Sequence, residues 1–150
     1  FLNMEICADM ETIPSFQKDH DKLQKGLYAM TDANGITTFD LRFKTPNAGD
    51  YITPKALHTI EHLLATVLRN GRCGGKIVYF GMGCRTGFYL LTVQLSREEV
   101  LALLKESIPA ALAMDTVPGS TRKECGNYLE HDPEGAKKEL AAYLTVLEAL

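Results

Sequence analysis

Hydrophobic and polar residues alternate along Ile36–Lys44, with an apolar residue at every second position from Phe39 to Phe43. A period of two is typical of a strand with one buried face and one polar face. A second candidate strand, Gly26–Met30, precedes it, and the Asn34-Gly35 pair between them is a strong hairpin signal. The pattern therefore predicts an antiparallel hairpin.

A helical period replaces this alternation after Thr53-Pro54, where Thr predicts an N-cap and Pro the first helical position. Apolar residues then recur three or four positions apart until Asn70-Gly71, a pair that favours a helix end. The sequence predicts an amphipathic helix between these two signals.

Two further helices follow in the second half of the chain. Ser96 and Glu99 form a capping-box pattern that predicts a helix over Arg97–Met114. An Asp-Pro pair opens a last helix over residues 132–150, in which leucine and tyrosine recur on one face.

Three more strands are predicted. Lys76–Phe80 and Phe88–Leu95 flank a glycine-dense turn at Gly81–Gly87, and Arg122–Leu129 is a candidate strand between the last two helices. The order of elements lacks the strict alternation of a parallel sheet. We expect an α+β fold, in which helices pack on an antiparallel sheet.

Length and composition narrow the class of protein. The 150 residues carry no repeat or linker, so residues 10–150 are expected to form one domain after a loosely specified N-terminal extension, residues 1–9. The extension carries two acids and no Lys or Arg, which argues against a signal peptide. A net charge of −3 argues against a nucleic-acid partner, and no apolar run is long enough for a membrane span. We expect a soluble cytoplasmic protein whose four cysteines are thiols or ligands, not disulfides.

The predicted helix after Thr53 carries an H-x-x-E-H motif formed by His58, Glu61 and His62. Two histidines four positions apart lie on one helix face and can bind one metal ion. Glu61 suits an acid/base role beside that metal, in the inverse order of the H-E-x-x-H motif of zinc peptidases. The competing interpretation is that both histidines have no ligand role, but chance rarely gathers half of a chain's histidines around one acid.

A second candidate is Cys84, which lies in the glycine-dense turn beside Arg85. Gly81, Gly83 and Gly87 allow positive φ or a close approach to a ligand. A neighbouring cation or metal favours the thiolate form of a thiol. The alternative is a small hydrophobic residue packed in a turn, and the turn alone does not decide between the two.

Two helical histidines need a third metal ligand from elsewhere in the chain, and a distant cysteine can supply it. Cys125 begins the run Cys-Gly-Asn-Tyr, but spacing alone does not choose among Cys125, Cys73 and Cys84. Cys7 and Cys73 have no convincing partner in the sequence.

Five blocks of residues occur in a defined order along the chain. They are Ser15-Phe16 with Asp19-His20, Phe39-Asp40-Leu41-Arg42-Phe43, His58-Thr59-Ile60-Glu61-His62, Met82-Gly83-Cys84-Arg85-Thr86-Gly87-Phe88-Tyr89, and Cys125-Gly126-Asn127-Tyr128 with His131. Together these blocks resemble the S-ribosylhomocysteine lyase (LuxS) family.

The resemblance implies a metal-dependent lyase that cleaves the thioether of S-ribosylhomocysteine. The implied products are homocysteine and 4,5-dihydroxy-2,3-pentanedione, the precursor of the quorum-sensing signal autoinducer-2. It implies one divalent metal ion per subunit, natively Fe²⁺, with Zn²⁺ or Co²⁺ possible. The matching metal ligands are His58, His62 and Cys125, and the matching acid/base residues are Glu61 and Cys84.

The same resemblance implies a homodimer with active sites at the interface. Ser15, His20 and Arg42 match positions that hold the substrate, and Ser15 and His20 are expected to come from the partner subunit. Family members often carry an acid where this chain has Val78, so substrate contacts there are expected to differ. The alternatives are a metallopeptidase with the inverted motif and a catalytically inactive metal-binding domain of the same fold.

Overall fold

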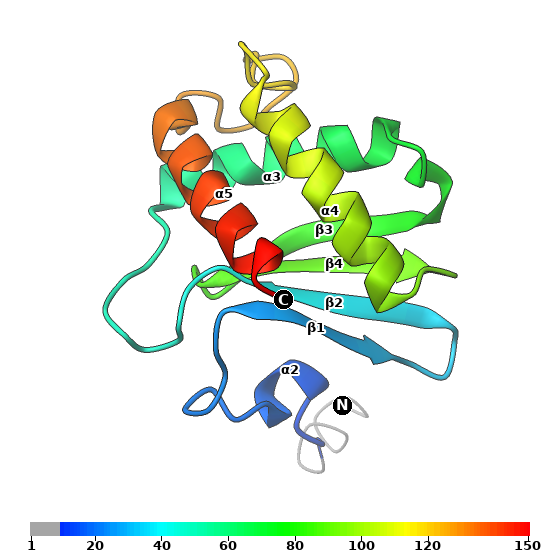
Figure 1. Cartoon of the computed structure of the whole chain (residues 1–150). Coiled ribbons are helices and arrows are strands. Elements are labelled where there is room, and N and C mark those ends of the chain that lie inside the picture. Colours follow the sequence, from blue (N-terminus) through cyan, green and yellow to red (C-terminus); the bar gives the residue numbers. More distant parts are fainter. Residues whose placement is uncertain (1–9) are drawn as a thin grey trace, which may run out of the picture.

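Within residues 10–150, the sheet has four strands, all antiparallel, in the order β1-β2-β4-β3. The structure is a computed structural model and describes residues 10–150. The elements are α2 (Pro14–Gln17), β1 (Gly26–Thr31), β2 (Ile36–Arg42), α3 (Pro54–Asn70), the 3₁₀ helix η1 (Gly74–Lys76), β3 (Ile77–Gly83), β4 (Gly87–Val93), α4 (Arg97–Leu112) and α5 (Pro133–Glu148). Helices α3, α4 and α5 pack together against one face of the sheet, which confirms the predicted α+β class (Figure 1).

The predicted hairpin is confirmed, with β1 and β2 paired from Gly26 and Arg42 to Thr31 and Thr37. The polar face of β2 is nevertheless hidden from water. Asp40 and Arg42 are each 1% exposed, because further parts of the chain cover them and pair with their charges. Alternation therefore identifies the strand, while the burial of its charged residues depends on tertiary contacts.

All three predicted helix starts are confirmed by their caps. The Thr53 side chain accepts a hydrogen bond from a backbone N–H of the first turn of α3, and Ser96 does the same for α4. Asp132 caps α5 by accepting from the N–H of Gly135 at 2.9 Å. Each cap satisfies an N–H that the helix itself leaves unpaired.

Several boundaries differ from the predictions. β3 continues to Gly83 and β4 begins at Gly87, so the turn between them has only three residues. The predicted strand Arg122–Leu129 is wrong, since this segment forms turns closed by local bonds such as Cys125 N–H to Thr121 O at 2.9 Å. Its side chains are mostly exposed, so it has no apolar face with which to join a sheet. The short helices α2 and η1 have no counterpart among the predicted elements.

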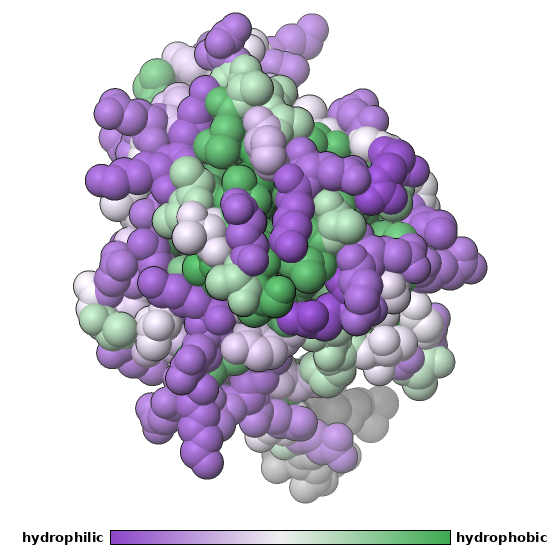
Figure 2. Space-filling view, in the orientation of Figure 1, coloured by the Kyte–Doolittle hydropathy of each residue, from purple (hydrophilic) through white to green (hydrophobic). Residues whose placement is uncertain are grey.

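The hydrophobic core lies between the sheet and the three long helices. Tyr143 of α5 stacks on Phe43 with ring centroids 4.0 Å apart, and its hydroxyl donates to the carbonyl of Gly26 at 2.9 Å. On the outside, the helical face is largely hydrophilic, with hydrophobic residues gathered near the middle where α4 and α5 lie (Figure 2). Among residues 10–150, no helix is both long enough and apolar enough to cross a membrane. The predicted extension, residues 1–9, lies outside the described residues.

Candidate functional site

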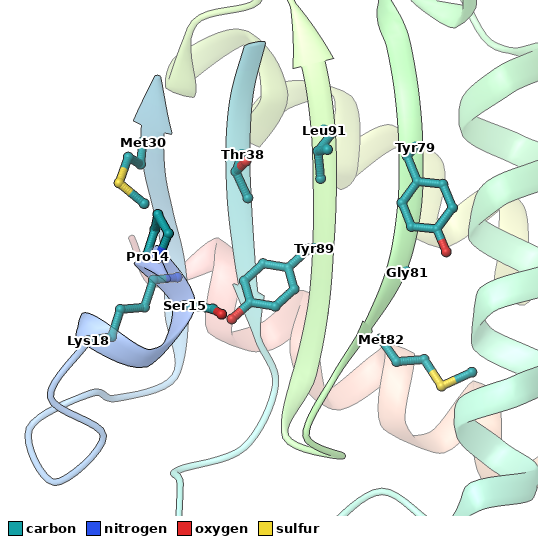
Figure 3. A pocket seen from close by; sticks show the side chains of 10 residues that line it. All are labelled: Pro14, Ser15, Lys18, Met30, Thr38, Tyr79, Gly81, Met82, Tyr89 and Leu91. Atoms are coloured by element: carbon teal, nitrogen blue, oxygen red, sulfur yellow. The ribbon is translucent and has the colours of Figure 1, made fainter. Parts of the chain in front are cut away.

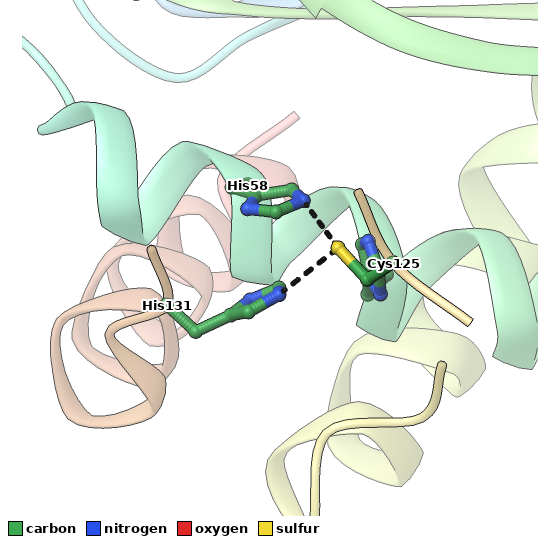
Figure 4. A group of neighbouring side chains, drawn as sticks. His58, Cys125 and His131 are labelled. Carbon is green, nitrogen blue, oxygen red and sulfur yellow. Dashed lines mark hydrogen bonds between the residues drawn. The ribbon is translucent and has the colours of Figure 1, made fainter. Parts of the chain in front are cut away.

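Four potential metal ligands meet at one end of α3. His58 and His62 come from the helix, and Cys125 and His131 come from the segment between α4 and α5. One ligand atom from each lies within 4.8 Å of the others, and all four residues are partly buried. The Cys125 Sγ lies 3.6 Å from Nε2 of His58 and 3.9 Å from Nε2 of His131 (Figure 4).

Backbone carbonyls orient the two helical imidazoles. Nδ1 of His58 lies 2.9 Å from the carbonyl oxygen of Glu130, and Nδ1 of His62 lies 2.8 Å from that of Pro118. A carbonyl can only accept, so each Nδ1 carries the hydrogen and each Nε2 keeps a free lone pair. Metal-binding histidines commonly have such an outer partner, which fixes their tautomer and orientation.

The loop that supplies the carbonyl of Pro118 turns sharply at its next residue. Gly119 has a φ of +66°, a conformation that residues with a Cβ rarely adopt. The position of a Cβ at Gly119 would be in ordinary van der Waals contact with Nδ1 of His62, so the backbone conformation and not crowding calls for glycine. The glycine therefore lets the loop approach the metal-binding face of α3.

The donor set fits a divalent transition metal. Imidazole nitrogen and thiolate sulfur are ligands of zinc and iron, and neighbouring donors of a tetrahedral zinc site lie about 3.3–3.6 Å apart. The 3.6 Å between Cys125 and His58 matches this separation. Burial is the main cause that lowers the pKa of His131 below its ordinary value, and repulsion from His58 and His62 when those rings are protonated acts in the same direction. A lowered pKa favours the neutral imidazole that binds metals.

A cavity of about 660 Å³ connects this cluster with the predicted catalytic turn. Its lining residues are Pro54, Leu57, His58, Glu61, Met82, Arg85, Asn127 and Glu130. Glu61 and the potential metal ligand His58 therefore share one cavity with Met82 and Arg85, which flank Cys84 in the sequence, while Cys84 itself is not a lining residue. A ligand in this cavity would contact His58 and Glu61 and lie beside the turn that carries Cys84.

The Cys84 side chain is exposed on the turn between β3 and β4. Positive φ values occur at Cys84 (44°) and Arg85 (61°) and not at the neighbouring glycines, so that part of the expectation is wrong. Gly87 serves another purpose, because a Cβ there would lie against the backbone of Leu41 in β2. Left-handed backbone at residues other than glycine is costly and is concentrated at functional sites.

Arg42 connects the Cys84 turn to a buried ion pair. Its Nη1 donates to Thr86 Oγ1 at 2.6 Å and lies 3.5 Å from Cys84 Sγ, and its Nη2 lies 2.7 Å from an Asp40 oxygen. Burial acts to lower the pKa of Arg42, but the hydrogen bond and charge of Asp40 outweigh it and raise the pKa above its ordinary value. The Lys18 ammonium reaches the same oxygen of Asp40 at 2.6 Å. The guanidinium is thus a fixed positive charge beside the thiol.

The remaining substrate candidates lie away from the metal cluster within one chain. Ser15 lines a cavity of about 420 Å³ on the sheet face opposite the helices, where it lies close to Tyr89 (Figure 3). His20 follows α2, and its Nδ1 lies 3.0 Å from the carbonyl oxygen of Lys18. Met82 lines both this cavity and the one beside His58, so the two hollows adjoin at β3.

Val78 and Cys73, two further positions discussed from the sequence, both lie outside the metal cluster. Val78 is 42% exposed on the edge strand β3, so this position brings no charge to the site. Cys73 packs against the core beyond the end of α3 and is not part of the four-residue cluster. Cys7 lies outside the described residues.

Sequence reasoning did not identify His131 as a member of the cluster, although it lies only six residues after Cys125. The short spacing between Cys125 and His131 is the feature of the sequence that points to a shared site. The predicted strand over Arg122–Leu129 obscured it, because an extended chain would have carried the two side chains apart. The observed turns bring them together instead.

The fold and the site define a small α+β protein with a His/Cys metal centre next to a displayed cysteine. The sequence profile described as S-Ribosylhomocysteinase (LuxS) matches residues 13–149. An S-ribosylhomocysteine lyase from Phocaeicola vulgatus is 48% identical over 143 residues, covering 90% of this chain and 89% of the relative. A lyase of the same name from Borreliella afzelii is 44% identical, covering 92% of this chain and 93% of the relative. One from Porphyromonas gingivalis is 41% identical, covering 90% of each. The chain belongs to the S-ribosylhomocysteinase (LuxS) family.

Proposed function

We propose that this protein is a metal-dependent carbon–sulfur lyase that cleaves the thioether of S-ribosylhomocysteine to homocysteine and 4,5-dihydroxy-2,3-pentanedione. The observation that carries the proposal is the shared cavity, in which a His/Cys metal cluster and Glu61 adjoin the turn of Cys84. Its family membership supplies the substrate class, since relatives of 41–48% identity are named S-ribosylhomocysteine lyase.

In this proposal His58, His62 and Cys125 hold one divalent metal ion in each subunit. When bound, the ion supplies Lewis acidity to the carbonyl and hydroxyl oxygens of the sugar chain. Nitrogen and sulfur donors suit ferrous iron, zinc and cobalt alike. On the resemblance to the family, we propose Fe²⁺ as the native ion and Zn²⁺ or Co²⁺ as substitutes.

Glu61 and Cys84 are the proposed proton-transfer groups. Moving a carbonyl along a sugar chain requires a proton to be removed next to a carbonyl twice, and a β-elimination then releases the thiolate of homocysteine. Glu61 lines the cavity and Cys84 lies on the turn beside it, so a carboxyl and a thiol can serve different faces of such a substrate. The 3.5 Å contact with Arg42 supports the role of Cys84, because it places a buried cation beside the sulfur.

The proposal includes substrate binding by Arg42, Ser15 and His20, the last two supplied by the partner subunit of a homodimer. The sheet face opposite the helices exposes apolar side chains, which supports a partner there. Met30, Tyr79 and Met82, around the cavity that Ser15 lines, are 46%, 57% and 48% exposed. Exposed apolar groups that adjoin one another mark interaction surfaces. A subunit covering this face would bring its own Ser15 toward β3, where the two cavities meet.

The proposal also places the protein in the cytoplasm, with residues 10–150 as the catalytic domain. Its role is to make the autoinducer-2 precursor. Cys73, Cys84 and Cys125 are free thiols, which suits a reducing compartment. The released homocysteine would also return to the methyl cycle of the cell.

A thiol-release assay tests the function directly. Reduced protein loaded with Fe²⁺ or Co²⁺ is incubated with S-ribosylhomocysteine, and free homocysteine is followed with a disulfide reagent. We expect continuous thiol release that stops when the metal is chelated. No release would contradict the lyase function and favour an inactive metal-binding domain, while hydrolysis of a peptide substrate would favour the metallopeptidase.

A further inference from the structure

The segment that carries Ser15 and His20 is held on the sheet by a single charged side chain. None of residues 10–23 is buried. Within the part of the chain that the structure describes, their hydrogen bonds and ion pairs stay inside the segment, with one exception. The exception is the ammonium of Lys18, which lies 2.6 Å from Oδ2 of Asp40 in β2.

The register of the sheet creates the place where Lys18 binds. Asp40 of β2 and Tyr89 of β4 are directly paired, so their side chains lie on the same face of the sheet. The Lys18 ammonium contacts the carboxylate and also lies 4.9 Å from the centroid of the Tyr89 ring, where a cation is attracted. The side chains of Lys18 and Asp40 are 22% and 2% exposed, so water and salt screen this pair less than an exposed one.

The position of Lys18 determines the positions of two proposed substrate contacts. Ser15 lies three residues earlier, and both side chains line the cavity of about 420 Å³ (Figure 3). The backbone carbonyl of Lys18 lies 3.0 Å from Nδ1 of His20. A carbonyl can only accept, so the imidazole donates to it and is oriented by it. Lys18 therefore places Ser15 with its side chain and His20 with its backbone.

The oxygen of Asp40 that binds Lys18 also binds Arg42. Nη2 of Arg42 lies 2.7 Å from Oδ2, and both side chains project from the same face of β2. With Nη2 fixed, the plane of the guanidinium is set, and Nη1 reaches Thr86 Oγ1 at 2.6 Å and Cys84 Sγ at 3.5 Å. A buried cation that loses its counter-ion is strongly unfavourable. The orientation of Arg42 therefore depends on this carboxylate.

We infer that Asp40 is a positioning residue shared by two groups of proposed substrate contacts. It orients Arg42 directly, and through Lys18 it docks the segment that carries Ser15 and His20. The roles of these residues rest on the proposed function, but the docking itself does not require lyase activity. In the proposed homodimer Ser15 and His20 enter the site of the partner subunit, so one Asp40 serves two active sites.

Lys18→Met tests the docking, because it keeps the length of the side chain and leaves the buried ion pair intact. Hydrogen exchange of the full chain, read by mass spectrometry, should be about tenfold faster across residues 10–23, since a charge-assisted hydrogen bond is lost. Lys18→Arg should keep the slow exchange. The matched control is Lys22→Met, whose ammonium lies 3.9 Å from Asp19 of the same segment and should not matter. Equal exchange in Lys18→Met and the parent protein would overturn the inference.

Steady-state kinetics separate positioning from a general effect on folding. In Lys18→Met the KM for S-ribosylhomocysteine should rise about tenfold with kcat nearly unchanged, because Ser15 and His20 are proposed to bind the substrate. Alkylation of Cys84 by iodoacetamide should keep its rate, since Arg42 retains its carboxylate. A lower kcat with an unchanged KM would contradict the positioning role of Lys18.

Asp40→Asn removes the charge that both cations share, so both effects should occur together. We expect exchange across residues 10–23 as fast as in Lys18→Met, and alkylation of Cys84 slowed about tenfold. Adding Lys18→Met to Asp40→Asn should not speed exchange further, because the two residues act as one unit. A further tenfold gain in the double variant would mean that Lys18 docks the segment without Asp40.

Carbon-13 NMR of the carboxyl groups tests the shared carboxylate without altering it. The Asp40 carboxyl signal should shift in both Lys18→Met and Arg42→Lys, because both cations contact Oδ2. Lys22→Met should leave the signal in place. A signal that moves in only one of the two variants would mean that Asp40 serves one group alone. Exchange, alkylation and NMR involve no turnover, so a failed thiol-release assay leaves the docking standing, and loss of the docking leaves the lyase function standing.

Discussion

The metal cluster and the Cys84 turn border one cavity but are held in place in different ways. The cluster combines one helix, α3, with residues 113–132, which contain neither helix nor strand. The turn joins two neighbouring strands and has a buried ion pair beneath it. The loop half of the cluster is held to α3 by a few polar contacts, whereas the sheet fixes the turn on both sides. The cluster should therefore depend on its metal, and the turn should not.

The largest expected effect separates the two regions through Cys84→Ala. Removing the proposed proton-transfer group should lower turnover of S-ribosylhomocysteine by about 10³-fold, within the range of general acid–base catalysis. Metal content should stay the same, because Cys84 is not in the cluster of possible ligands. Thiol release and elemental analysis of the same sample measure both quantities, with Cys73→Ala as the matched control. An empty metal site in Cys84→Ala would assign this thiol to the metal.

Cys125→Ala should have the reverse effect. We expect metal affinity to fall about 100-fold, with turnover lost at low metal concentration, because the only sulfur donor of the cluster is removed. The three histidines account for the weak binding that persists. The rate at which iodoacetamide alkylates Cys84 should not change, since the sheet holds that turn. Full metal affinity in Cys125→Ala would show that the thiol is not a ligand.

The sequence predicted the two regions unequally. The helix that carries His58 and His62 has a helical period over its seventeen residues, a cap just before them and an end signal at their close, so local pattern sufficed. Residues 113–132 have no period at all. Their path depends on bonds to α3, such as the carbonyl of Pro118 to His62, which no local pattern encodes.

The same limit applies to the sheet region. Alternation predicted β2, but the burial of Asp40 requires Lys18 from a distant segment and Arg42 from its own strand. Glycine spacing pointed to the turn, yet the positive φ values occur at Cys84 and Arg85 because the strands extend to the glycines on either side. Local pattern thus located the chemistry, and tertiary contacts determined its geometry.

A smaller effect is expected from a change of the cation beside the Cys84 turn. Arg42→Lys keeps the positive charge, but a single ammonium cannot reach Asp40, Thr86 and Cys84 together as the guanidinium does. We expect alkylation of Cys84 at pH 7 to slow about tenfold, because the 3.5 Å contact between the guanidinium and the sulfur is lost.

The matched control is Arg85→Lys. Arg85 follows Cys84 in the chain, but its Nε donates to the carbonyl of Ile52 at 2.9 Å. Alkylation should keep its rate in this variant. Equal slowing in both variants would mean that any nearby change of the turn lowers the reactivity of Cys84, and the specific role of Arg42 would be lost.

The smallest expected effect tests whether the sheet is stable without the metal. Burial raises the pKa of Tyr143 well above its ordinary value, with a smaller contribution from the charge of Asp40. A raised folded-state pKa contributes stability that is fully present below the unfolded value of about 10 and is lost as the pH rises above it. The free energy of unfolding should therefore fall above about pH 10. Lys44 acts in the same direction, because Glu139 and Asp50 outweigh the effect of its burial and raise its pKa.

Tyr143→Phe removes the hydroxyl that donates to the carbonyl of Gly26. It should cost about 1 kcal/mol at neutral pH and flatten the alkaline fall by up to about 1.4 kcal/mol per pH unit. Urea unfolding with and without chelator measures both effects, and Tyr28→Phe, which alters an exposed tyrosine, is the control. We expect the same cost in both conditions, because this contact joins α5 to β1 away from the cluster. A cost that appears only in the metal-loaded protein would mean that the metal stabilises the sheet as well, and the two regions would then be one cooperative unit.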